Sequence, residues 1–146
     1  MHYVTAELSL RGLIALPTIR NVAGYDIIAA TTDGKEHANI QVKTSHKRVN
    51  FWRMPPSPDI CAGPNDYYVL VRWVAREKKF EAFMLMGKEA KAEVERIERI
   101  QGKRVTNGSR KRVLPSIHVG GKWEKQSSAW KRHWEEWHLD KRANIA

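Results

Sequence analysis

Polar and apolar residues alternate through residues 37–43 of the stretch 35–45, and the neighbouring stretch 25–32 also reads as a strand. A period of two is typical of strands that bury one face. Between the stretches stands Asp33-Gly34, a pair that favours a two-residue type I′ turn. The pattern therefore predicts an antiparallel β-hairpin.

Three polar side chains fall on one face of this hairpin. If Asp33-Gly34 is the turn, Thr32 lies opposite Lys35. Counting outward from this pair, one residue at a time on each strand, puts Asp26 opposite Gln41. Alternation puts Lys43 on the same face. A carboxylate, an amide oxygen and an ammonium so gathered can hold a hard divalent cation and steady a phosphate beside it. The alternative is an ordinary solvated hairpin face.

The rest of the chain predicts a mixed α/β order of elements. A nearly unbroken apolar run is typical of a central buried strand, and apolar residues at helical spacing predict helices. The expected helices are 5–11, 88–100 and 127–139, the further strands are 13–16, 66–74 and 80–86, and the proline-rich segment 55–64 is a surface loop.

The composition indicates one domain with an anionic partner. At 146 residues we expect a single domain, 1–146, with its core at 5–100 and a basic, tryptophan-rich remainder at 101–146. Lys and Arg number 26 against 16 Asp and Glu, and the resulting charge of +10 favours nucleic acid over an anionic membrane surface. No apolar run is long enough for a transmembrane span or a secretory signal, and Cys61 has no second cysteine to pair with. We expect a cytoplasmic protein without a membrane partner.

The residues of the hairpin resemble the core of the PD-(D/E)XK nuclease superfamily, which includes restriction endonucleases and archaeal Holliday junction resolvases. The resemblance rests on residues 20–28 and 40–45 and covers 5–100, with a likeness to small bacterial members. It implies an α/β fold, a restriction endonuclease-like mixed β-sheet flanked by helices.

The resemblance also implies roles for particular residues. Asp26 and Gln41 would bind Mg²⁺ or Mn²⁺, the main-chain carbonyl of Val42 would complete the metal site, and Lys43 would help the attacking water and the phosphate. Most relatives carry Glu where this chain has Gln41, which lowers the charge of the site by one. Relatives also place an acid on the first helix, and Glu7 is the candidate here, although it lies at a different helical angle.

Two basic stretches are candidates for contacting a nucleic-acid backbone. One follows the hairpin and interleaves cations with an aromatic ring that could stack on a base, and the other is expected as a flexible loop that begins at Arg99. The alternative for the second is a solvated basic loop. The candidate residues are Lys47, Arg48, Trp52 and Arg53 in the first stretch and Lys103, Arg104, Arg110, Lys111 and Arg112 in the second.

Three tryptophans, Trp130, Trp134 and Trp137, form one stripe of the last expected helix. So much aromatic area predicts a docking face, either on the chain's own sheet or on a second copy. Because one metal site cuts one strand, we expect a homodimer with this stripe as the candidate interface.

The sequence thus leaves three function classes open. The first is a metal-dependent endonuclease that hydrolyses phosphodiester bonds, with DNA as the expected substrate. The second is a nucleic-acid-binding pseudo-nuclease that has lost the metal. The third is a non-catalytic subunit of a larger restriction or repair complex.

Overall fold

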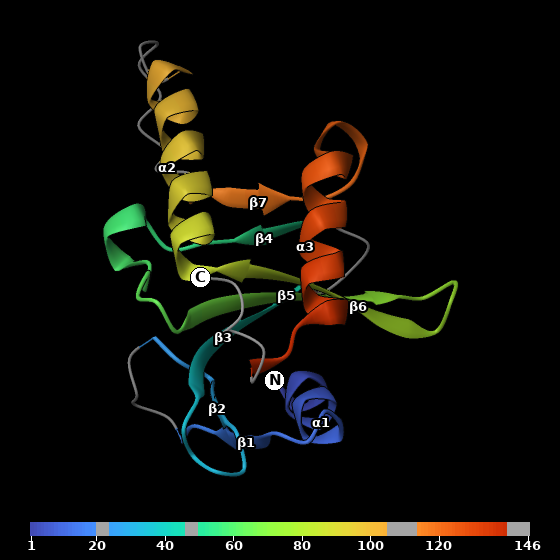
Figure 1. Cartoon of the computed structure of the whole chain (residues 1–146). Helices are drawn as coiled ribbons and strands as arrows, with labels where there is room; N and C mark the ends of the chain where they lie inside the picture. The colour runs from blue at the N-terminus through green and yellow to red at the C-terminus, as the bar shows by residue number, and fades with distance from the viewer. Residues whose placement is uncertain (20–23, 46–49, 105–113, 140–146) are drawn as a thin grey trace.

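A five-stranded mixed β-sheet forms the centre of the molecule (Figure 1). The computed structural model of the chain describes residues 1–19, 24–45, 50–104 and 114–139. The strand order is β1-β2-β3-β5-β6, with β3 and β5 parallel and the other neighbours antiparallel. A two-stranded ribbon, β4 and β7, stands beside this sheet. The strands are β1 (Ile14–Pro17), β2 (Ile27–Ala30), β3 (His37–Ser45), β4 (Phe51–Arg53), β5 (Asp66–Val74), β6 (Lys79–Met86) and β7 (Ser116–His118).

Helices flank the sheet, so the mixed α/β fold predicted from the sequence is confirmed. They are α1 (His2–Leu10), α2 (Gly87–Arg104) and α3 (Glu124–Glu136), with 3₁₀ turns η1 (Ser57–Asp59) and η3 (Gly121–Trp123). Among the described residues, no helix combines the length and the apolar character needed to cross a membrane.

Each broad face of the sheet carries its own core. On the face that we call the first face, Val4 and Leu8 of α1 pack with Ile27, Ile40 and Met84. These side chains are fully buried, which removes their apolar surface from water and stabilises the fold. Alternate residues point the other way and form the second face.

The second face is covered over β5 and β6 but open over β1 and β2. Ala90 and Val94 of α2 pack over Leu70 of β5, together with residues of the β4–β7 ribbon. Over the other half of this face, Leu16 and Ile28 are paired across the strands and remain exposed. The described residues thus leave this part of the second face accessible to solvent.

Helix α3 covers the outer edge of β6. Trp130 packs in the second-face core and Trp134 in the first-face core, so the helix straddles the edge. Trp137, expected on this helix, instead follows its end in an extended conformation and packs in the first-face core. His133 Nδ1 lies 3.2 Å from the carbonyl oxygen of Met84 on β6. A covered edge strand cannot pair with another chain.

This arrangement corrects the prediction that the tryptophan stripe is a dimer interface. Trp130, Trp134 and Trp137 are 5%, 3% and 5% exposed within one chain. The stripe packs on the chain's own sheet because its rings fill both cores. A homodimer remains a prediction, without these residues as its interface.

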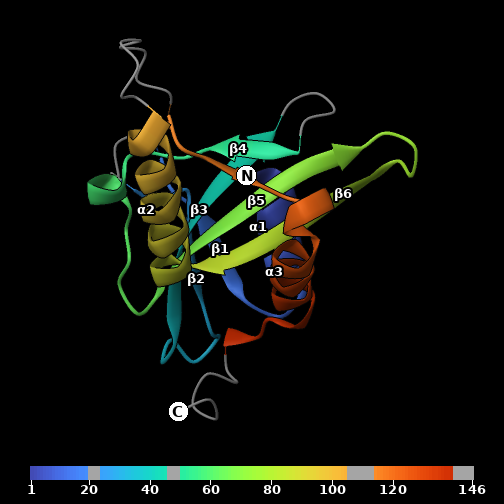
Figure 2. The same ribbon diagram turned by 90° about the horizontal axis from the view of Figure 1, so that it is seen from above.

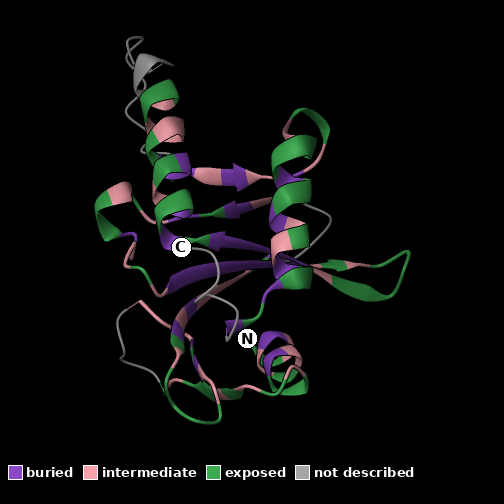
Figure 3. Cartoon of the chain, viewed as in Figure 1, coloured by how far each residue is buried: buried purple, intermediate pink, exposed green. Residues whose placement is uncertain are grey.

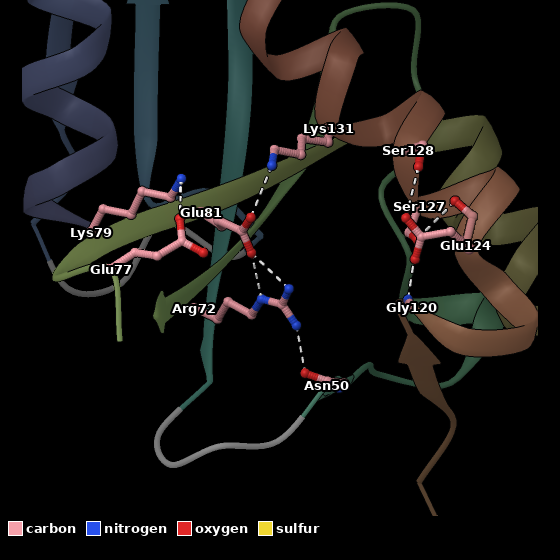
Figure 4. Close-up of polar contacts among 10 residues, drawn as sticks. All are labelled: Asn50, Arg72, Glu77, Lys79, Glu81, Gly120, Glu124, Ser127, Ser128 and Lys131. Carbon is pink, nitrogen blue, oxygen red and sulfur yellow. Dashed lines mark hydrogen bonds and ion pairs between the residues drawn. The ribbon is translucent and has the colours of Figure 1, made fainter. Parts of the chain in front are cut away.

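Polar contacts also fasten α3 to the sheet, as Figure 4 shows. Glu81 of β6 accepts from Lys131 Nζ of α3 at 2.9 Å and from Arg72 Nη2 of β5 at 2.7 Å. Arg72 also donates to the side-chain oxygen of Asn50. One carboxylate therefore joins two strands and a helix.

Several boundaries differ from those expected. The strand at 66–74 is confirmed to the residue, whereas the second helix extends to Arg104, so Arg99, Lys103 and Arg104 are helical rather than part of a loop. Pro17 lies within β1, not beyond it, since an edge strand has no outer partner for the missing N–H.

Candidate active site on the β2–β3 hairpin

The hairpin register predicted from the sequence is confirmed. Ile27 pairs with Ile40 and Ile28 with Asn39, and the backbone N–H of Asp26 donates to the carbonyl of Ile40 at 2.9 Å. The same register, extended by one residue, puts Asp26 opposite Gln41. The side chains of these two residues are joined by a hydrogen bond.

The predicted turn type is wrong, although the register survives. The N–H of Gly34 donates to the carbonyl of Thr31 at 2.9 Å, and of the two central residues expected in a type I′ turn only Gly34 has a positive φ, +71°. Asp33 instead accepts the Thr31 hydroxyl at 2.6 Å and the Lys35 N–H at 3.2 Å. The side chain of Asp33 therefore stabilises a four-residue loop. A loop longer by one residue on each side keeps the same opposed pairs.

Two donors fix the Asp26 carboxylate. Gln41 Nε2 and the backbone N–H of Val42 both donate to Asp26 Oδ2 at 2.7 Å. Bonds to an ionised acceptor are among the stronger hydrogen bonds, so the rotation of this carboxylate is restricted. Both bonds end on Oδ2, which leaves Oδ1 as the oxygen that these donors do not use.

Lys43 shares the second face with Asp26 and Gln41. It lies two residues beyond Gln41 on β3, pairs with Leu70 of β5 and is half-buried. Val42, between them, points to the first face and packs against its core. The three polar residues therefore stand together at the border between the covered and the open half of the second face.

The donor set suits a weakly held hard cation. Asp26 supplies one carboxylate, and the Gln41 amide, turned over, and the Val42 carbonyl can supply neutral oxygens. Among the described residues, no group of three or more His, Cys, Asp or Glu side chains is placed to hold a metal ion. A cation here would thus keep much of its water shell.

Glu7 is not brought to this face. It lies on α1, which packs against the first face, and it forms an ion pair with Arg11 at 3.7 Å. Its role as the acid contributed by the first helix remains a prediction from the resemblance alone, and the present arrangement does not support it.

Trp52 is not available to stack on a base, so that prediction is wrong. Its ring is 2% exposed, its indole N–H donates to the carbonyl of Val71 at 3.1 Å, and it contacts Phe83. The ribbon strand β4 turns this side chain inward, while the next residue, Arg53, is exposed.

The other predicted nucleic-acid contacts are largely untested. Lys103 and Arg104 form the end of α2. The remaining candidates, Lys47, Arg48, Arg110, Lys111 and Arg112, lie outside the described residues.

A buried acid on the same face as the site was not foreseen from the sequence. Asp66, 8% exposed, accepts from Asn39 Nδ2 at 3.0 Å and from the N–H of Gly63 at 2.7 Å. Partial burial, and then the Asp66 carboxylate nearby, raise the pKa of Tyr25 to about 12. The hydrogen bond between Asn39 and Asp66 ties β3 to the start of β5. Its position at the head of an apolar run was the available signal.

The chain has a distant structural likeness to a known protein. No protein-family model matches the chain, and no curated protein matches it. The solved structure of a bacterial homing endonuclease is similar at 16% identity, covering 91% of this chain and 86% of that one, with a TM-score of 0.41.

Proposed function

We propose that this chain is a metal-dependent nuclease that hydrolyses phosphodiester bonds of DNA at the Asp26–Gln41–Lys43 face. The observation that carries the proposal is the pair of 2.7 Å bonds that orient Asp26 on a face shared with Lys43. The open half of the second face beside it admits a large substrate, and the charge of +10 favours a polyanion.

Each residue has a distinct role in this proposal. Asp26 would hold Mg²⁺ or Mn²⁺, with oxygens of Gln41 and Val42 as further ligands. The cation would supply charge for the phosphate oxygens and a bound water of lowered pKa. The Lys43 ammonium would offset the negative charge that develops on the phosphate or orient the attacking water. The half-buried position of Lys43 strengthens its electrostatic effect relative to an exposed lysine.

Plasmid nicking tests the proposal. Wild type should convert supercoiled plasmid to the open form with Mn²⁺ or Mg²⁺ and not with chelator, and Asp26→Asn should lose this activity by at least about a hundredfold, which corresponds to some 2.7 kcal/mol of barrier. Asp59→Asn, which removes an exposed carboxylate of η1, is the matched control and should cut as wild type does. Equal cutting by Asp26→Asn would refute the proposed active site.

DNA binding without cleavage is the second candidate function, and one observation favours it. Both donors to the Asp26 carboxylate end on Oδ2, so hydrogen bonds within the chain already occupy one of its two oxygens. A protein that binds duplex DNA and nicks none of it in either metal would support this alternative.

A further inference from the structure

The β5–β6 hairpin extends beyond the body of the molecule, as Figures 1 and 2 show. All residues from Ala75 to Phe80 are exposed, and Trp73 at the base of the projection is 47% exposed (Figure 3). We call residues 73–80 the arm. The core residues of β5 and β6 end at Val71 and Ala82, so the arm extends beyond both cores.

The tip of the arm is basic. Arg76 and Lys78 are exposed, while Lys79 forms an ion pair with Glu77 (Figure 4). Lys78 has a φ of +48°, a left-handed conformation that favours glycine or asparagine. The geometry of the turn therefore does not account for a lysine at this position. Within the part of the chain that the structure describes, neither Arg76 nor Lys78 has an ion-pair partner, and the two cations give the tip a charge that complements a polyanion.

Contacts at the base hold the arm in one direction. Trp73 and Phe80 pair across the strands with ring centroids 4.9 Å apart, and Phe80 also contacts Tyr3 of α1 at 4.9 Å. On the other face of the ribbon, Glu81 binds both Arg72 and Lys131. The arm is thus braced from α1 and from α3, one on each face.

The arm lies within reach of the same ligand as the candidate active site. Lys43 pairs with Leu70, and β5 continues from there to Val74 before the turn. At about 3.3 Å per residue, the end of β5 at Val74 lies about 13 Å beyond Lys43 along the strand, and the turn follows directly. This distance is less than one turn of B-form DNA, about 34 Å, so one duplex can touch both.

We propose that the arm is a β-ribbon that enters the major groove of duplex DNA next to the Asp26–Gln41–Lys43 face. The major groove of B-form DNA, about 12 Å wide, admits a two-stranded ribbon, whereas that of an A-form RNA duplex is deep and narrow. The inference rests on the proposed nuclease function and makes B-form DNA, not duplex RNA, the substrate class.

Binding measurements with the arm variant Arg76→Gln/Lys78→Asn test this inference. Asparagine keeps the left-handed turn, so the fold should be preserved. In chelator, where no cleavage occurs, affinity for duplex DNA should fall at least about tenfold. The slope of log K against log salt should lose about 1.8, because each lost phosphate contact releases about 0.9 fewer counterions. Affinity for duplex RNA should change much less.

The control variant Lys88→Gln/Lys125→Gln removes the same charge from exposed positions at the starts of α2 and α3. It should bind DNA nearly as wild type does. Wild type should also displace methyl green, a major-groove dye, more readily than the arm variant does, with netropsin as the minor-groove comparison. Equal losses in the two variants, or wild-type affinity in the arm variant, would overturn the inference.

DNA binding by the arm variant and nicking by Asp26→Asn test the arm proposal and the nuclease proposal separately. If the arm variant binds like wild type while Asp26→Asn is inactive, the arm proposal fails and the nuclease proposal stands. If Asp26→Asn cuts normally, the proposed active site fails whatever the arm does.

Discussion

The Arg11 guanidinium lies over the Trp134 ring, with Cζ 4.3 Å from the ring centroid, and its Nη1 donates to the Trp134 carbonyl at 2.7 Å. The same nitrogen lies 3.4 Å from the carbonyl of Trp137. Arg11 follows α1, and the two carbonyls belong to the end of α3. A residue near the N-terminus therefore caps the last helix, where a cation also interacts favourably with the helix dipole.

Replacing Arg11 should loosen the junction of the first and last helices. Arg11→Ala leaves carbonyls of α3 without their donor, and we expect the free energy of unfolding to fall by about 1.5–3 kcal/mol. Urea unfolding followed by tryptophan fluorescence measures the loss. Arg132→Ala, an exposed arginine of α3, should change stability by less than about 0.5 kcal/mol. A loss no larger for Arg11→Ala than for Arg132→Ala would show that the cap contributes nothing.

Part of the free energy of unfolding should depend on pH through Glu93. Two hydrogen bonds from Arg96, from Nε at 2.9 Å and from Nη2 at 2.7 Å, lower the pKa of the Glu93 carboxyl despite its burial. Because the folded-state pKa is the lower one, this stabilisation is present above the unfolded pKa of about 4.3 and is lost as pH falls through the folded value.

Unfolding of wild type and Glu93→Gln at several pH values checks the assignment. The wild type should be the more stable near pH 7, and the difference between the two should shrink below about pH 4.3. Glu95→Gln, an exposed neighbour on α2, should follow the wild-type pH profile. A wild-type advantage that grows on acidification would contradict the stated direction of the pKa shift.

The register of the site hairpin was predictable from the sequence, because a loop that is longer by one residue on each side leaves the same residues opposed. Replacing the expected two-residue turn by the four-residue loop around Asp33 leaves Asp26 opposite Gln41. The buried strand at 66–74 was equally predictable, since a long apolar run has few alternatives.

The sequence does not reveal which strands pair with one another or which surface each helix packs against. The parallel pairing that sets Asn39 beside Asp66 joins segments from distant parts of the chain, and no local pattern encodes it. Burial of Trp52 depends on the β4–β7 ribbon, whose second strand comes more than sixty residues later. The tryptophan stripe was read correctly as a docking face, and its target, the edge of β6, became clear only from the fold.

Lys43→Ala should separate metal binding from cleavage. The ammonium acts on the phosphate or the water and not on the cation, so calorimetric affinity for Mn²⁺ should stay within about twofold of wild type while nicking falls by about a hundredfold or more. Lys35→Ala, an exposed lysine of the hairpin loop, is the control and should retain both properties. Wild-type nicking by Lys43→Ala would remove this residue from the mechanism.

Gln41→Glu gives a test of the metal site that depends on pH. In wild type, Gln41 Nε2 donates to Asp26 Oδ2 at 2.7 Å, and one carboxylate leaves cation binding weak, with dissociation constants of the order of millimolar. The variant replaces that donor by a second carboxylate. Two carboxylates this close cannot both ionise readily, so without metal the pair should hold a proton.

A divalent cation should displace this proton and bind more tightly to Gln41→Glu than to wild type, by about tenfold or more. The gain should increase with pH, because proton release accompanies binding. Calorimetry in buffers of different ionisation enthalpy, at pH 6 and pH 8, measures both the affinity and the proton count. Mn²⁺ should support wild-type nicking better than Mg²⁺, since Mn²⁺ accepts an amide ligand and irregular geometry more readily. If Gln41→Glu binds Mn²⁺ no better than wild type at pH 8, Gln41 does not face the cation, and its role is limited to orienting Asp26.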